Sequence, residues 1–257
     1  MGRYDDTSMG GSHNGFQATH WPDILAARTF TDQRRRELVG AIIGRYWKPV
    51  YCYLRRKGYA NAKAKDLTQG FFQEVVLGRE LIQQADRQKG RFRTFLLTAL
   101  GRYVASIHRA EGARKRRPEA GHIYLEGIDW SGTPLPTDRA TPDQAFTYVW
   151  ASALLDEVIA AVEAGCSKDK QETHWAVFRA RVIRPIREDA EPPSLEKVCA
   201  DFGIPNEKAA SNMITTVKRR FQRTLRVRVR QFVATDDEVD VEILDLMRIL
   251  SGGGAAS

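Results

Sequence analysis

The sequence has few of the groups on which covalent chemistry and metal binding depend. Its three cysteines, Cys52, Cys166 and Cys199, are odd in number and far apart, so they fit neither a disulfide framework nor a metal-ligand spacing. The five histidines are scattered, and none has the paired spacing of a zinc site. A phosphate-cradling glycine loop and a nucleophile elbow are also absent. We therefore expect no catalytic group, no metal and no cofactor.

Long apolar runs are missing as well. Residues 1–20 are polar and glycine-rich, without the apolar core of a secretory signal. No stretch approaches the roughly 18 uninterrupted apolar residues of a membrane span. These absences predict a cytoplasmic protein with no membrane partner.

Alternation of apolar and polar residues with period two persists nowhere, whereas apolar residues recur at steps of three and four along most of the chain. This pattern predicts an all-α fold of two helical domains joined by a long linker, the second domain containing a helix-turn-helix. The expected order is a disordered tail (residues 1–20), a first domain (21–117), a linker rich in glycine and proline (118–142), a second domain (143–235) and an acidic amphipathic tail (236–257).

Glycines and prolines indicate where several helices bend or end. Pro49 should bend or split the helix that follows Trp21, and Gly58 should end it. In the second domain, a helix that carries Trp175 should stop near Pro185.

The segment 194–233 is the most informative part of the second domain. Ser194 is a candidate N-cap for a short helix, Gly203 ends that helix, and a long helix begins near Asn206. In a helix-turn-helix, the second helix enters the major groove of DNA. A helical hairpin with a solvated, charged end gives the same pattern. The DNA reading assigns contacts to Ser211, Asn212, Thr215, Thr216, Lys218, Arg219 and Arg220.

A second basic segment lies at residues 89–117. The chain carries a formal charge of +8, which favours an anionic partner because cations that neutralise phosphates release counterions. Cations mixed with aromatic residues suit an unpaired nucleic-acid strand, although a solvated helix end accounts for the terminal cluster equally well. The candidate contacts are Lys89, Arg91, Arg93, Arg102, His108, Arg109, Lys115 and Arg116.

Three motifs in order carry a family resemblance: Tyr46-Trp47-Lys48-Pro49-Val50-Tyr51, then Asp66-Leu67-Thr68-Gln69-Gly70-Phe71-Phe72, then Gly90-Arg91-Phe92-Arg93-Thr94-Phe95-Leu96-Leu97. Together with the helix-turn-helix, they resemble bacterial RNA polymerase sigma factors of the extracytoplasmic-function type, especially the variety abundant in planctomycetes. The resemblance covers roughly residues 21–250.

The resemblance implies that the chain joins the RNA polymerase core, recognises promoter DNA and directs transcription initiation. It assigns polymerase binding to Asp66, Gln69 and Phe72, and promoter melting to Arg102, His108 and Arg109. The helix that begins near Lys208 would read the distal promoter element as duplex. An inhibitory anti-sigma protein is a further candidate partner.

The sequence departs from the family pattern in two places. Lys63 and Lys65 replace the usual acidic residues before Asp66, and the cations usual near Ser211 and Met213 are missing. These departures motivate an alternative, a helix-turn-helix transcriptional regulator that does not join polymerase.

An enzyme is the least favoured hypothesis. Asp66 and Glu74 lie about two helical turns apart, which would suit a metal, but a solvated helix face is the simpler interpretation.

The acidic tail has two interpretations of its own. Its carboxylates, beginning with Asp236 and Asp237, would fold back on the basic helix 218–230 and compete with DNA, or the tail would be a capping helix. In the second case Val241, Leu244 and Leu250 would complete the core of the second domain.

Overall fold

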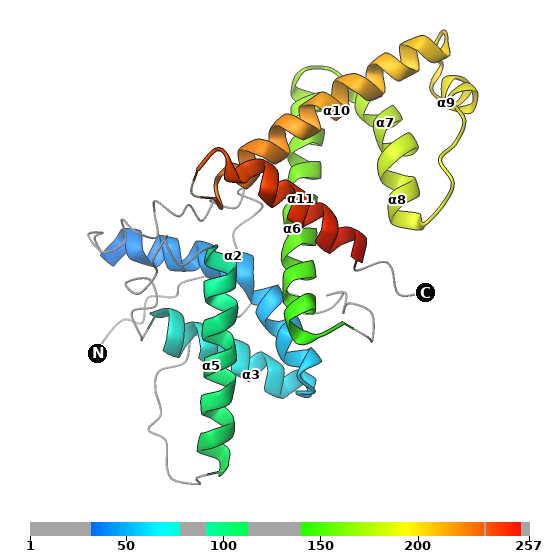
Figure 1. The fold of residues 1–257 in the computed structure, drawn as a ribbon. Helices are drawn as coiled ribbons and strands as arrows, with labels where there is room; N and C mark the ends of the chain where they lie inside the picture. The colour runs from blue at the N-terminus through cyan, green and yellow to red at the C-terminus, as the bar shows by residue number, and fades with distance from the viewer. Residues whose placement is uncertain (1–31, 78–90, 113–139, 234, 253–257) are drawn as a thin grey trace, which may run out of the picture. The chain divides into compact units, whose positions relative to one another are not determined.

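The structure, a computed structural model, describes residues 32–77, 91–112, 140–233 and 235–252 (Figure 1). Every regular element in these ranges is helical, which confirms the all-α prediction for the described part of the chain. The predicted disordered tail at 1–20 and nearly all of the predicted linker at 118–142 lie outside the described residues.

The chain forms two compact units. Unit 1 comprises residues 1–152 and 231–257, and unit 2 comprises 153–230. The boundary lies inside helix α6 (Pro142–Lys168) rather than at the linker predicted from glycine and proline content. Unit 2 is therefore inserted into unit 1, because the acidic tail belongs to the unit formed by the start of the chain.

Helix α2 (Asp32–Arg56) forms much of the core of unit 1. Its buried side chains include Ile42, Tyr46 and Val50. Pro49 lies inside this helix, which continues through it. Of the two predicted outcomes, a bend or a split, the split is therefore wrong. Gly58 ends α2 as predicted: at φ 93° its N–H bonds to Arg55, and the N–H of Tyr59 reaches Leu54.

Helix α3 (Asn61–Phe71) continues into the π-helical turn η2 (Phe72–Leu77). Helix α5 (Phe92–Gly112) contacts the end of α3, where the ring of Phe71 lies 5.7 Å from that of Tyr103. Gly70 stands at this contact, where an added Cβ would collide with the Tyr103 hydroxyl.

Gly70→Ala is therefore expected to lower the free energy of unfolding by about 1–3 kcal/mol, because Tyr103 is a rigid, buried ring that has to move. Urea unfolding followed by circular dichroism measures the change. Gly40→Ala is the matched control: nothing lies within 4 Å of its added Cβ, so inside α2 it should stabilise by about 0.5–1 kcal/mol. Equal effects of the two changes would show that helix propensity, and not the approach of Tyr103, dominates.

The first half of α6 and the C-terminal segment complete unit 1. Trp150 is almost fully buried, and the ring of Phe232 meets it edge-on at 5.6 Å. The guanidinium of Arg45 lies 4.6 Å from the centre of the Phe232 ring. Helix α11 (Glu238–Gly252) follows and buries Val239 and Leu246.

Unit 2 consists of the second half of α6 and four further helical pieces. They are α7 (Glu172–Phe178), the π-helical turn η4 (Arg179–Ile183) with α8 (Arg184–Glu188), α9 (Leu195–Phe202) and α10 (Glu207–Arg230). Val162, Trp175, Phe178 and Val217 share one cluster, which fixes α10 against α6 and α7.

The helical segment that carries Trp175 runs through Pro185 and ends at Glu188, close to the predicted stop near Pro185. Pro185 lacks an N–H, but the wider turn before it lets Arg184 donate to the carbonyl of Arg179, five residues back. The helix then continues to Glu188, and Asp189 ends it by adopting the left-handed conformation.

By length and composition, α6 is the one helix among the described residues that is apolar enough to cross a membrane. Its apolar side chains have a different explanation in this fold. Phe146 and Trp150 are buried in unit 1, and Val158 and Val162 are buried in unit 2, so α6 contributes to two cores.

Candidate nucleic-acid interface

Capping residues set the angle and spacing of α9 and α10. The Ser194 hydroxyl accepts a hydrogen bond from the N–H of Lys197, as expected of an N-cap. Gly203, at φ 64°, ends α9, and the N–H of Ile204 bonds to the Cys199 carbonyl. The Asn206 side chain then accepts from the N–H of Ala209 and starts α10. A short helix, a tight turn and a long helix thus follow one another as the sequence predicted.

Helix α10 has one buried face and one exposed polar face. Ala210 and Val217 are buried, and Val177, Val198 and Ile204 form one cluster with Ala210. At 100° per residue, Lys208, Asn212, Thr215 and Arg219 lie along the opposite side of the helix. The exposed predicted contacts are Lys208, Ser211, Asn212, Thr215, Thr216, Lys218 and Arg219. We call this set the α10 face.

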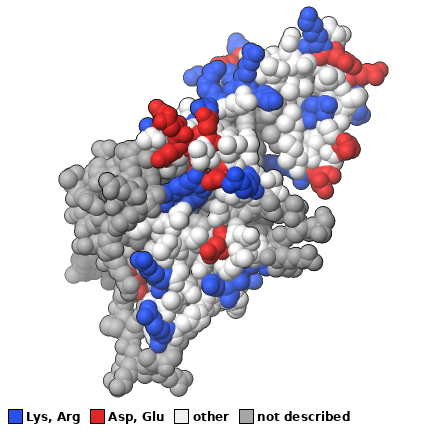
Figure 2. Space-filling model, viewed as in Figure 1, with Lys and Arg blue, Asp and Glu red and all other residues white. Residues whose placement is uncertain are grey.

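The α10 face is chemically suited to DNA. No Asp or Glu occurs from Lys208 to Arg230, and Figure 2 shows Lys and Arg side chains along this part of the molecule. The hydroxyls of Thr215 and Thr216 donate to carbonyls of their own helix, which leaves their oxygens able to accept from a base or an amide. Cations for phosphates and small polar groups for base edges therefore share one surface.

Arg220 is a correction to the predicted contacts. Its guanidinium pairs with Asp169 at 2.5 Å and lies against Gly165, whose missing side chain makes room for it. Arg220 therefore ties α10 to the end of α6 instead of contributing to the α10 face.

Helix α5 has an exposed stripe in unit 1. Thr94, Thr98, Arg102 and Arg109 follow one another at helical spacing and are all exposed. His108 is also exposed, and its Nε2 lies 2.9 Å from the Tyr59 hydroxyl, with the two rings stacked. The structure thus brings Arg102, His108 and Arg109 to the surface of one helix, as predicted.

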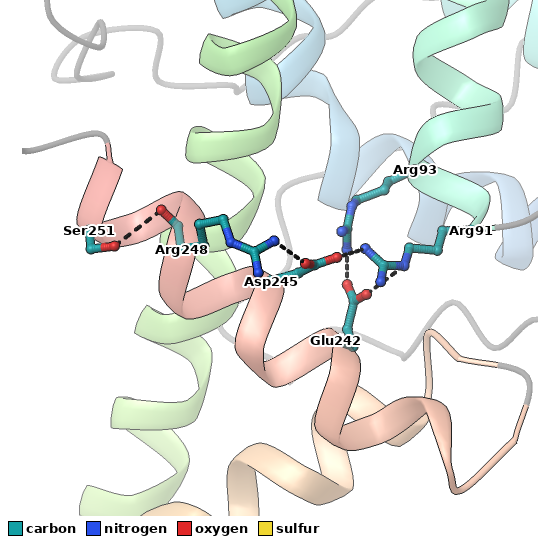
Figure 3. Close-up of polar contacts among 6 residues, drawn as sticks. All are labelled: Arg91, Arg93, Glu242, Asp245, Arg248 and Ser251. Atoms are coloured by element: carbon teal, nitrogen blue, oxygen red, sulfur yellow. Dashed lines mark hydrogen bonds and ion pairs between the residues drawn. The ribbon is translucent and has the colours of Figure 1, made fainter.

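Arg91 and Arg93, at the start of the same helix, point toward α11 (Figure 3). Arg91 Nε lies 2.7 Å from Glu242, and Arg91 also pairs with Asp245. Arg93 pairs with Glu242 and lies 4.5 Å from the centre of the Trp150 ring. Burial, together with the neighbouring Arg91, lowers the pKa of Arg93 to about 10. Arg93 is therefore no surface contact for DNA, contrary to the prediction, because α11 and Trp150 enclose it.

The three predicted polymerase contacts differ in how far they are exposed to solvent. Asp66 is exposed and Gln69 is half-buried, so both reach the surface of α3. Phe72 is fully buried and meets Phe71 edge-on at 5.4 Å. The assignment of Phe72 is wrong, because its ring is part of the core of unit 1.

Neither interpretation of the acidic tail anticipated its contacts with Arg91 and Arg93. Val241 and Leu244 are exposed, so they do not complete the core of the second domain. Glu242 is fully buried between Val239 and Leu246 on the inner face of α11, and sequence reasoning missed it. Helical periodicity could have found it, because Glu242 lies three residues after Val239 and four before Leu246 and so shares their face of the helix.

Three predicted contacts, Lys89, Lys115 and Arg116, lie outside the described residues. Within the described ranges, no three His, Cys, Asp or Glu side chains come together as a metal site.

No protein-family model, curated protein or solved structure matches this chain.

Proposed function

We propose that this protein is a sigma factor, which joins the RNA polymerase core and directs promoter recognition and transcription initiation. The α10 face is the observation that carries the proposal, because it offers an acid-free, cationic and hydrogen-bonding helix surface of a size that fits a major groove. In this proposal α9 and α10 act as the helix-turn-helix of a second domain, and the protein acts in the cytoplasm.

The exposed stripe of α5 supports a second contact with promoter DNA. Arg102 and Arg109 would hold the phosphates of a melted strand, and His108 and Tyr59 offer aromatic faces beside them. Asp66 and Gln69 would contact polymerase from α3. The polymerase performs the phosphoryl transfer, and this chain contributes binding and orientation.

Reconstitution tests the proposal. The purified chain, mixed with core polymerase from the organism that encodes it, should co-purify with that core and produce transcripts of one defined length from a promoter that the core alone ignores. Asp66→Ala should reduce both results. Glu172→Ala, which removes an exposed acid from unit 2, is the control and should reduce neither.

The alternative is a helix-turn-helix transcriptional regulator that does not join polymerase. The burial of Phe72 favours it, because one of the three residues assigned to polymerase binding is unavailable. Sequence-specific duplex binding with no association with core polymerase would establish this alternative and end the sigma-factor proposal.

A further inference from the structure

Helix α11 has two faces of different character. Its inner face holds Glu242, whose side chain is 1% exposed, against Arg91 and Arg93. Its outer face carries three exposed apolar side chains, Val241, Leu244 and Met247. The acidic inner contact is therefore the specific feature by which α11 binds α5 within unit 1.

The inner contact is a charge pair more than a set of aligned hydrogen bonds. Neither oxygen of Glu242 has a hydrogen-bond donor in good alignment, so the two guanidiniums compensate its charge by proximity. Asp245 adds a second carboxylate to Arg91, and that guanidinium holds the pKa of Asp245 below its usual value. Two carboxylates thus occupy a site made by two arginines.

Arginine pairs of this kind bind phosphate as readily as carboxylate, because the planar guanidinium offers paired donors to either anion. Trp150 holds the Arg93 guanidinium over its ring, so the site keeps its orientation when the anion changes. The same helix continues into the exposed stripe with Arg102 and Arg109. A strand bound along this stripe would meet Arg91, which is half-buried just before the helix begins. Arg93 lies on the buried side of α5 beneath α11, so the strand would reach it only after α11 moves away.

We propose that α11 is an intramolecular competitor: Glu242 and Asp245 occupy the anion site of Arg91 and Arg93, and the phosphates of a single DNA strand displace them. The inference rests on the proposed function, since it regulates the strand-binding surface assigned to α5. The exchange replaces two carboxylates by two phosphates at the same arginines. The remaining free-energy cost of displacing α11 is then the loss of the burial of Val239 and Leu246, which strand binding has to exceed.

The variant Glu242→Gln/Asp245→Asn tests the competition in the full-length chain. Fluorescence anisotropy with a labelled single-stranded oligonucleotide should show binding on the order of tenfold tighter than for the unaltered protein, because two phosphate contacts become available. The slope of log affinity against log salt should steepen by about 1.4. Circular dichroism verifies that the variant is folded, and Asp245→Asn alone should give a smaller gain in the same direction.

Glu172→Gln/Glu191→Gln is the matched control. It makes the same change in net charge at two exposed acids of unit 2, and it should leave strand affinity within about twofold of the unaltered protein. A gain equal to that of the α11 variant would attribute the effect to net charge and overturn the competitor role.

Hydrogen exchange of the unaltered protein is the second measurement, which does not depend on any variant. Saturating single-stranded DNA should speed exchange of amides in residues 238–252. Unchanged or slower exchange there would overturn the competition, and the proposed function would survive if promoter-specific initiation is still observed. Absence of both strand binding and initiation would instead reject the proposed function, and the competitor role with it.

Discussion

Reversing two charges on the α10 face, with Lys218→Glu/Arg219→Glu, is expected to weaken duplex DNA binding about 100-fold near physiological salt. Two phosphate contacts are lost and two repulsive charges replace them on a surface that has no acid of its own. The slope of log affinity against log salt should become shallower by about 1.8. Anisotropy titrations of a labelled duplex at several salt concentrations measure both quantities.

Arg184→Glu/Arg187→Glu is the control for that experiment. These arginines are exposed on α8 of the same unit and pair with Glu188 and Asp156, and such surface pairs contribute less than about 1 kcal/mol each. The net charge changes equally, but the α10 face is untouched. An equal loss of affinity for both variants would mean that the duplex is attracted by overall charge, and the helix-turn-helix assignment would fail.

The second large effect concerns the buried ion pair. Arg93→Met should lower the free energy of unfolding by about 3–5 kcal/mol, because Glu242 then keeps its charge in a buried position with only Arg91 beside it. Urea unfolding followed by circular dichroism provides the measurement. Arg102→Met, an exposed position on the same helix, should change stability by less than about 0.5 kcal/mol.

A double variant distinguishes the contribution of the ion pair to stability from that of the packing of Arg93. Arg93→Met/Glu242→Leu replaces both charges by apolar groups, and it should recover most of the stability that Arg93→Met loses. If the double variant is instead less stable than Arg93→Met, then stacking of Arg93 on Trp150 contributes more than the pair does.

Local sequence features predicted the helices and their ends well. Gly58 and Gly203 adopt the left-handed conformations that end α2 and α9, and Ser194 caps α9 through its hydroxyl. Each of these effects depends on a few neighbouring residues. The exposed α10 face followed from the same logic, because a 3.6-residue period separates its buried and polar sides.

The incorrect assignments of Arg93 and Phe72 could have been avoided from the helical periodicity of the sequence. Arg93 lies on the same side of α5 as Leu96, Leu100 and Val104, so helical periodicity alone places it on the buried face. Phe72 belongs to an apolar run with Phe71, Val75 and Val76, a pattern that favours burial over the polymerase contact that the family resemblance implies. In both cases periodicity was the better guide to burial.

The position of the acidic tail could not be predicted from neighbouring residues in the sequence. Charge patterns favour a basic partner for Glu242 and Asp245, but two basic segments were available, and the choice depends on contacts between residues about 150 positions apart. The observed choice is the ion pairs with Arg91 and Arg93, formed on the same face of α11 that buries Val239 and Leu246.

The insertion of unit 2 between residues 152 and 231 has a practical consequence for proteolysis. A protease that cuts once within 189–194 severs the backbone, yet the downstream piece still carries Phe232 and α11, which pack on Trp150, Arg91 and Arg93. The nicked protein should elute from a sizing column as a single species and separate into two fragments only in denaturant.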